Sequence, residues 1–187
     1  MEHFLNFLNS IQALDENELD VIRKISTEQS ISRNEELQPV GHTCRTIYFV
    51  TSGMLRIWYL KDGTDITESF EPENAIVARA ESLFAGVPSK KAIQALEDSQ
   101  LIAVSAPKLF DLFDRHPAIE RMFRRIIEQQ YVKTIQRIES LQFQTPEERY
   151  RQLITTQPDM LKRVPLKFIA SYLGITQVSL SRIRSRK

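Results

Sequence analysis

The chain has 187 residues, of which 42% are hydrophobic and 26% charged, with 5 Gly, 8 Pro and one Cys. This composition is typical of one or two folded domains and excludes disordered, collagen-like and disulfide-scaffold chains, as well as cysteine zinc and four-cysteine iron–sulfur sites. No apolar run approaches the roughly 20 residues of a membrane helix, and the acidic start lacks the basic region of a signal peptide. We therefore expect a soluble, cytoplasmic protein with no membrane partner.

The net charge of +1 conceals an uneven distribution along the chain. Seven of the 25 basic residues lie at positions 160–187, a segment that contains no Asp or Glu. The first 159 residues therefore hold 18 basic and 24 acidic residues, a net charge of −6, against +7 for the C-terminal segment. A basic segment on an acidic body is typical of a protein that binds a polyanion, and the alternative on charge alone is a solvated basic tail.

The N-terminal part begins with a helical pattern and then changes to short strands. Asp15 and Glu18 have the spacing of a capping box. The apolar residues at helical spacing around them are Leu14, Leu19, Ile22 and Ile25. From Ser30 to about Val104, β-branched and aromatic runs cover residues 46–50, 54–60, 66–70, 91–96 and 100–104. With a hairpin turn predicted at Asp62-Gly63, these strands predict a small antiparallel barrel or a jelly-roll-like β-roll.

A long helix is predicted after this β-rich region. A short helix over 108–115 is interrupted at His116-Pro117, because proline disfavours helix in the residue before it. From Ala118 to about Gln142 there is no Gly or Pro, and apolar residues recur every three or four positions, which predicts a helix about 37 Å long. We interpret it as a dimerisation helix, since an apolar stripe between two domains needs a partner to bury it; the alternative is a core helix of one domain. The stripe consists of Ile119, Phe123, Ile127, Tyr131, Ile135 and Ile138.

The C-terminal segment predicts a further helix from Glu147 to Thr156 and then two short helices joined at Gly174. The apolar face of the first short helix consists of Leu166, Ile169, Ala170 and Leu173. Gly174 suits the left-handed conformation that ends a helix, and Thr176 caps the next one. In that last helix, Leu180 and Ile183 point inward, which leaves a polar and basic face outward. Such a face is what reading a DNA major groove requires, so we interpret the pair as a helix-turn-helix rather than an ordinary helical hairpin.

Together, these parts resemble the Crp/Fnr family of bacterial transcription regulators, whose sensor domain is a cyclic-nucleotide-binding β-roll. The most specific stretch is Ile169–Arg184, IASYLGITQVSLSRIR, which is close to the family pattern IA..LG(I/V)T..(T/S)(L/V)SR. Ile47–Gly53 and Pro146–Tyr150 are weaker matches. The resemblance implies an α+β fold with a sensor domain at 1–115, a dimerisation helix at 116–142 and a helix-turn-helix domain at 143–187 with a short or missing wing.

The resemblance also implies a homodimer that binds a two-fold symmetric site in double-stranded DNA and contacts RNA polymerase. It places base contacts at Gln177, Val178 and Arg182. Phosphate contacts are expected from Ser179 and Arg184, and Ser181 lies on the same face. Val178 replaces an acidic residue that is often found at its position. The competing interpretation is a ligand-sensing signalling module whose C-terminal helices bind a protein.

The family binds its cyclic nucleotide through Gly-Glu near the start of a phosphate-binding cassette and Arg-(Ser/Thr)-Ala near its end. An ungapped alignment puts Arg79 in place of the glutamate and Ser89 in place of the arginine. A buried phosphate without its cation loses a charge-assisted pair, so we expect that cyclic AMP is not the effector, which is another small molecule or none. As an alternative, Lys90 or Lys91 takes the place of the missing phosphate-binding arginine, and Glu81 that of the missing glutamate. If not, both lysines are solvated residues at a strand edge.

Enzymatic activity is not expected. The sequence contains no Gly-rich phosphate loop, no serine elbow and no pair of histidines at metal-binding spacing. Isolated histidines and the single Cys44 do not indicate a haem or a redox switch either. We therefore expect no catalytic residue, no metal and no cofactor.

Overall fold

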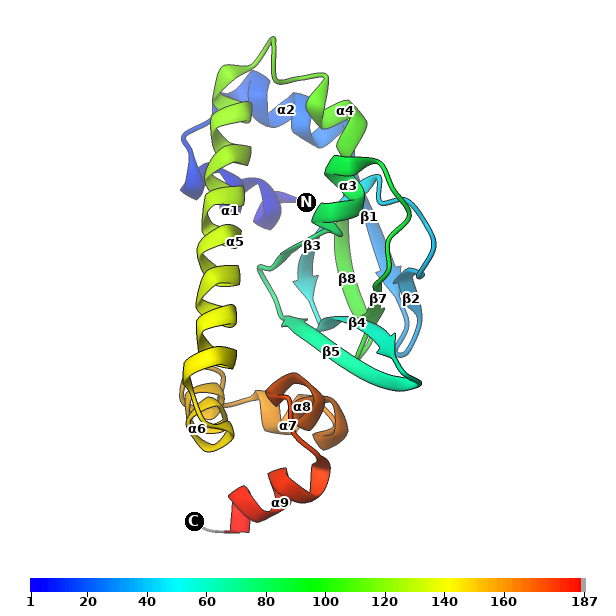
Figure 1. The fold of residues 1–187 in the computed structure, drawn as a ribbon. Coiled ribbons are helices and arrows are strands. Elements are labelled where there is room, and N and C mark those ends of the chain that lie inside the picture. Colours follow the sequence, from blue (N-terminus) through cyan, green and yellow to red (C-terminus); the bar gives the residue numbers. More distant parts are fainter. Residues whose placement is uncertain (186–187) are drawn as a thin grey trace.

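The structure, a computed structural model, describes residues 1–185 and contains a β-roll made of two four-stranded antiparallel sheets (Figure 1). The first sheet has the order β1 (Ser26–Ile31), β8 (Ser99–Ser105), β3 (Thr46–Ser52) and β6 (Ile76–Val77). The second has the order β2 (Glu36–Gln38), β7 (Ala92–Ala95), β4 (Leu55–Lys61) and β5 (Thr64–Glu71). The predicted α+β class with an N-terminal antiparallel roll is confirmed.

Alternate residues of the strands point into a core between the two sheets. Val50, Leu55 and Ile93 are completely buried there. The predicted hairpin turn joins β4 to β5 at Asp62 and Gly63, whose φ angles of 50° and 76° are the positive values that a tight hairpin needs. Strand β1 begins before the predicted β-region, because its four central residues are exposed and polar and so hide the strand pattern.

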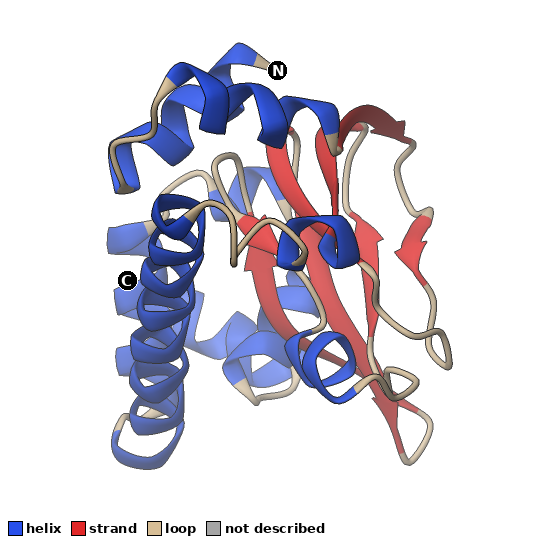
Figure 2. Cartoon of the chain, turned by 90° about the horizontal axis from the view of Figure 1, so that it is seen from above, coloured by secondary structure: helices blue, strands red, loops and turns tan. Residues whose placement is uncertain are grey.

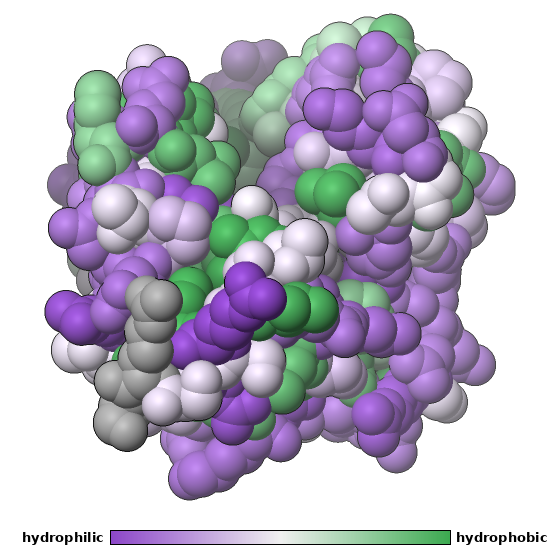
Figure 3. All heavy atoms as spheres, turned by 60° about the horizontal axis from the view of Figure 1, so that its bottom comes forward, coloured by the Kyte–Doolittle hydropathy of each residue, from purple (hydrophilic) through white to green (hydrophobic). Residues whose placement is uncertain are grey.

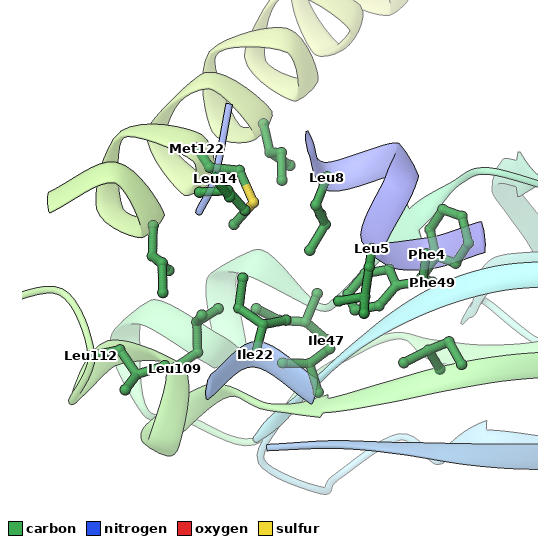
Figure 4. Close-up of a cluster of buried hydrophobic side chains, with 14 of the residues drawn as sticks. Phe4, Leu5, Leu8, Leu14, Ile22, Ile47, Phe49, Leu109, Leu112 and Met122 are labelled. Atoms are coloured by element: carbon green, nitrogen blue, oxygen red, sulfur yellow. The ribbon is translucent and has the colours of Figure 1, made fainter. Parts of the chain in front are cut away.

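Helices α1 (Glu2–Ile11) and α2 (Glu16–Lys24) precede the roll, and α1 packs against β3 and α5 (Figure 2). The predicted capping box of α2 is present: the Asp15 carboxylate accepts from the Glu18 N–H at 2.8 Å, and Glu18 accepts from the Asp15 N–H at 2.9 Å. Figure 4 shows the apolar cluster that these helices complete. Its labelled members are Phe4, Leu5, Leu8, Leu14, Ile22, Ile47, Phe49, Leu109, Leu112 and Met122.

Helix α3 (Ala80–Ala85) and helix α4 (Ala106–Phe110) are short, and α4 ends earlier than the helix predicted over 108–115. The long helix is α5 (Pro117–Phe143). Its first turns belong to the apolar cluster, where Ile119, Met122 and Ile126 are buried. From Ile127 to the end of α5 no residue is buried. Among the residues described, no helix combines the length and hydropathy needed to cross a membrane.

The C-terminal part contains α6 (Pro146–Thr156), α7 (Met160–Arg163), α8 (Leu166–Leu173) and α9 (Gln177–Ser185). These helices enclose a second apolar core that includes the buried side chains of Leu153, Ile169 and Leu173. Met54 and Phe70 of the roll are part of the same core, so the C-terminal helices pack directly on the β-roll. Figure 1 shows α7 and α8 beside the β4–β5 hairpin, with α9 beyond them.

Polar contacts fix α8 to the outer face of this hairpin. The Ser171 hydroxyl accepts from the Thr67 N–H at 2.8 Å and donates to the Asp65 carbonyl at 3.0 Å. Arg56 donates to both carboxylate oxygens of Asp65, at 2.7 and 2.8 Å. Its guanidinium also lies 3.6 Å from the ring centroid of Phe168. Arg56 is only 2% exposed and its ion pair lies within the roll, so α8 covers this pair with the Phe168 ring and shields it from water.

A second polar cluster centres on Arg163 at the end of α7. Its guanidinium donates to both carboxylate oxygens of Glu73, at 2.9 and 2.7 Å, to the Gly53 carbonyl at 3.0 Å and to Glu97. The hydrogen bonds from Arg163 lower the pKa of Glu73 to about 2, because they stabilise the carboxylate. This cluster therefore adds a pH-dependent contribution to the docking of the C-terminal helices.

Acid should weaken this docking. The pKa of Glu73 falls from 4.5 to about 2 on folding, so the stability it contributes is present above pH 4.5 and lost as the pH falls towards 2. We expect Glu73→Gln to lower the free energy of unfolding at pH 7 by about 1 kcal/mol, since the pair is partly exposed and screened, and to flatten the pH dependence in that window. Chemical denaturation at pH 7 and pH 3 measures both effects. The exposed Glu36→Gln serves as the control, and equal pH dependence of all three proteins would contradict the assignment.

Candidate nucleic-acid interface and sensor site

The turn between α8 and α9 has the geometry that the sequence predicts. Gly174 has a φ of 70° and ends α8 in the left-handed conformation. The N–H of Ile175 then donates to the Ala170 carbonyl at 3.0 Å. Thr176 accepts a hydrogen bond from the N–H of Ser179 at 3.1 Å, which is the capping contact expected at the start of α9. These local interactions fix the angle at which α9 leaves the domain.

Helix α9 is held by one face and exposed on the other. Leu180 is 1% exposed and Ile183 is half-buried, as predicted. The residues expected to contact DNA lie on the outer side: Gln177, Val178, Ser181, Arg182 and Arg184 are exposed, and Ser179 is half-buried. The basic residues Arg186 and Lys187 lie outside the described residues. Figure 3 views this end of the molecule, where hydrophilic side chains surround a few apolar ones.

One residue of the predicted apolar face of α8 is misplaced. Leu166 is 40% exposed, whereas Phe168 is 9% exposed and belongs to the core. The reason is that α8 lies against the roll as well as within its own domain, and Phe168 points to Arg56 of β4. The prediction treated the helix-turn-helix as a separate unit and so missed this second contact face.

The predicted dimerisation stripe divides into two parts. Ile119 is completely buried in the sensor core, and Phe123 packs with Phe110 and Phe113 at centroid distances of 5.7 and 5.4 Å. Ile119 is therefore not available to a partner subunit, and its place in the stripe was wrong. The large exposed apolar side chains of α5, with their exposed fractions, are Ile127 (37%), Tyr131 (66%), Val132 (54%), Ile135 (38%), Ile138 (45%), Leu141 (47%) and Phe143 (78%). No segment of the described chain buries them.

In the sensor, the two residues that replace the family's charged anchors have different environments. Ser89 is buried, and its hydroxyl donates to the carbonyl of Lys91 at 2.7 Å, so it stabilises its own loop. Arg79 is 7% exposed, and its Nη1 lies 3.5 Å from a carboxylate oxygen of Glu68. Lys91 forms an ion pair with the same carboxylate, and its Nζ lies 5.5 Å from the ring centroid of Tyr59.

These contacts test the alternative roles that the sequence left open for Lys90, Lys91 and Glu81 in the ligand pocket. Lys91 is half-buried and paired, so its interpretation as a solvated lysine was wrong. Lys90 and Glu81 are exposed, and neither forms an ion pair within the described residues. Glu81 therefore does not restore the missing acid.

The acidic partners in this site were missed by the sequence analysis. Glu68 lies at a β-bulge of β5, because Ile57 pairs with Ser69 while Trp58 pairs with Thr67. A bulge redirects the side chain of the extra residue, and a simple alternation of exposed and buried positions does not reveal it. Glu71 lies opposite Leu55, whose side chain is in the roll core, and so faces inward.

Helix α5 contributes two cations to the same region. Lys133 lowers the pKa of Glu71 through its charge, and Glu68 interacts with Arg137. The guanidinium of Arg137 lies 3.8 Å from the ring centroid of Tyr172 and donates to the Tyr172 carbonyl of α8. Desolvation at this position lowers the pKa of Arg137. Over residues 1–185 the structure contains no cluster of His, Cys, Asp and Glu that would hold a metal ion.

The chain resembles known proteins in sequence over one domain and in structure over most of its length. Residues 28–116 match the sequence model of the cyclic nucleotide-binding domain. No curated protein has significant sequence similarity to the chain. FixK2 from Bradyrhizobium japonicum has a similar structure, with a TM-score of 0.71 at 21% identity, over 87% of this chain and 84% of FixK2.

Two further structures are similar over most of their length. The c-di-GMP-responsive global regulator CLP from Xanthomonas campestris has a TM-score of 0.70 at 16% identity, over 92% of this chain and 91% of CLP. A protein from Eubacterium rectale, described as a transcriptional regulator of the Crp/Fnr family, has a TM-score of 0.72 at 16% identity, over 91% of this chain and 82% of its own.

Residues 28–116 therefore match a cyclic nucleotide-binding domain, and the chain as a whole shares the fold of these solved structures. The resemblance to the Crp/Fnr regulators, inferred from the sequence, is confirmed at the level of the fold.

The half-buried carboxyl of Glu71 should make stability fall as the pH rises. Burial raises its pKa from 4.5 to about 7, and the groups that act on it are Ser69, Lys133, Glu68 and Arg79. A carboxyl that is protonated in the folded state but ionised in the unfolded one destabilises the fold progressively from pH 4.5 to 7. We expect a loss on the order of 2 kcal/mol across this range, measured by denaturation at each pH. Glu71→Gln should remove most of this loss, and a variant that retains it would contradict the assignment.

Proposed function

We propose that this chain is a homodimeric, sequence-specific DNA-binding transcription regulator of the Crp/Fnr type, and that it acts in the bacterial cytoplasm without responding to cyclic AMP. The proposal divides the chain into a sensor domain (1–115), a dimerisation helix (116–142) and a helix-turn-helix domain (143–187). Double-stranded DNA, a second copy of the chain and RNA polymerase are its proposed partners. No enzymatic activity is part of it.

The observation that carries this proposal is the outer face of α9. Gln177, Ser181, Arg182 and Arg184 are exposed there, while Leu180 anchors the helix from the opposite side. No acidic residue lies anywhere in positions 160–187. A polyanion approaching α9 therefore meets cations and hydrogen-bond donors on a segment that carries no acidic residue of its own. Arg182 and Gln177 are the residues we assign to base edges, and Val178, 61% exposed, suits the methyl group of a thymine.

Dimerisation rests on the uncovered part of α5. Ile127, Tyr131, Ile135 and Ile138 follow one another in steps of three and four along the helix, so they share one side. A second α5 packed on the same side would bury all four in a two-fold arrangement, as expected for a symmetric dimer. Such pairing gives the complex two α9 helices related by symmetry, which is what a symmetric operator requires.

Several features of the sensor argue against cyclic AMP. Ser89, at the position of the family's phosphate-binding arginine, uses its hydroxyl within its own loop. Arg79, at the position of the ribose-binding glutamate, cannot accept a hydrogen bond from a ribose hydroxyl. Glu68 is already engaged by Arg79 and Lys91.

The dimer is tested by placing a charge in the exposed stripe of α5. Ile135→Glu should convert the dimer to a monomer, because two carboxylates would be buried near the symmetry axis. Gln129→Glu adds the same charge on the opposite side of α5 and should leave the dimer intact. Sedimentation velocity measures the mass of each. A wild-type chain that sediments as a monomer, or an Ile135→Glu variant that remains dimeric, would contradict this interface.

DNA readout is tested at Arg182. Arg182→Ala should weaken binding at one base position of the preferred site by about 1–3 kcal/mol and lower discrimination there. Arg33→Ala removes an exposed arginine of the sensor and should change neither. Titration of fluorescent duplexes at several salt concentrations measures affinity and its salt dependence. Binding that does not weaken with salt would favour a protein partner over DNA, and unchanged selectivity in Arg182→Ala would remove this residue from base readout.

A further inference from the structure

Six charged side chains gather between the roll and the middle of α5. They are Glu68, Glu71, Arg79, Lys91, Lys133 and Arg137. The surface is hollowed between α5 and the roll when the molecule is viewed from the helix-turn-helix end (Figure 3). Four of the six groups are cations and two are carboxylic acids, so the cluster has an excess of positive charge. An excess of charge in a partly desolvated site is costly unless a counter-charge compensates for it.

Arg79 supplies an independent sign that an acceptor is missing. The residue is 7% exposed, and its Nε is buried without a hydrogen-bond partner among the described residues. A guanidinium has five N–H donors, and buried ones normally find acceptors. Here the one ion pair, to Glu68, is long at 3.5 Å. The donor set of Arg79 therefore matches an oxygen-rich group that the chain itself does not provide.

The two cations of the roll are held on fixed parts of the fold. Arg79 directly precedes α3 and its backbone N–H donates to the thiol of Cys44 at 3.4 Å. Lys91 lies next to the start of β7, where Ser89 fixes its backbone. Both cations converge on Glu68, whose carboxylate occupies the position that an external anionic group would take between them.

We propose that Arg79 and Lys91 of the roll, together with Lys133 and Arg137 of α5, bind a small effector that carries two negative charges. One anionic group replaces Glu68 between Arg79 and Lys91 and accepts from the free Nε of Arg79. The second interacts with Lys133 and Arg137. The shared chemistry is a compact dianion: a dicarboxylate supplies the two groups separately, whereas a phosphate carries both charges on one group, which would replace Glu68 between Arg79 and Lys91. A cyclic nucleotide fits poorly, since it carries a single negative charge and would leave half of the four cations without a counter-charge.

This site deepens the proposed function, because its regulatory meaning rests on that function. Arg137 donates to the Tyr172 carbonyl of α8 and stacks on the Tyr172 ring. A ligand that draws Arg137 towards the roll therefore competes with a contact of the helix-turn-helix domain. Lys133 lies on the same helix as the exposed stripe. One small molecule would thus act on the two elements that position the α9 helices.

The test is a titration of the full-length protein with inorganic phosphate, succinate and cyclic AMP. Calorimetry at pH 7.5 and constant ionic strength should show saturable binding of phosphate, succinate or both, in about the millimolar range or tighter. The proposal requires cyclic AMP to bind more weakly than the better dianion. No saturable binding of either dianion, or tighter binding of cyclic AMP, would overturn it.

Three variants locate the binding. Arg79→Gln should weaken dianion binding by roughly tenfold or more, whereas Lys90→Gln, a change at the exposed neighbouring lysine, should leave it unchanged. Glu68→Gln should strengthen binding, because it removes the carboxylate that competes for both cations. Weaker binding in Glu68→Gln would overturn the proposal even if Arg79→Gln failed to fold. Duplex binding by the ligand-free protein separates the two claims, since DNA binding without dianion binding would leave the proposed function intact.

Discussion

Helix α5 has buried side chains only in its first turns, where it joins the apolar cluster of the roll, and none after Ile126 within the described chain. The free energy of burying its remaining apolar side chains, about 25 cal/mol per Å² of apolar surface, is available only through contact with another molecule. This constraint links the other features. A paired α5 defines a two-fold axis, the axis relates two α9 helices, and the charged sensor site lies against the same helix.

The docking of the C-terminal helices makes this arrangement stiff. Phe70 and Met54 of the roll share an apolar core with Leu173, and Ser171 and Arg163 add polar contacts across the same boundary. A helix-turn-helix attached only by a linker would rotate freely. Here its orientation depends on β4, β5 and the end of α5, so a displacement of the roll or of α5 would also move α9.

The sequence predicted the elements whose signals are local. The capping box at Asp15, the hairpin at Asp62-Gly63 and the Gly174 turn each depend on a few neighbouring residues, and all three are present. Contacts between distant segments were not predictable in the same way. Leu166 was expected inside because helical spacing alone cannot show that Phe168 would meet Arg56 of the roll. Ile119 was assigned to a dimer surface because spacing does not distinguish burial by a partner from burial in the chain's own apolar cluster.

The sensor site shows the same limit. Alignment to a family pattern revealed what Arg79 and Ser89 replace, but not what surrounds them. Glu68 becomes a neighbour of Arg79 through a β-bulge, and Lys133 and Arg137 approach from a helix more than 40 positions away in the chain. Such a cluster is formed by the tertiary structure, so the spacing of residues in the sequence does not reveal it.

Selection of duplexes from a random DNA pool by the full-length protein tests the central claim most directly, because it requires both a reading helix and a two-fold pairing. The account predicts enrichment of an inverted repeat whose half-sites are about one helical turn, roughly 34 Å, apart, with two chains bound per duplex. Enrichment of a single unpaired motif, or no enrichment at low salt, would contradict it.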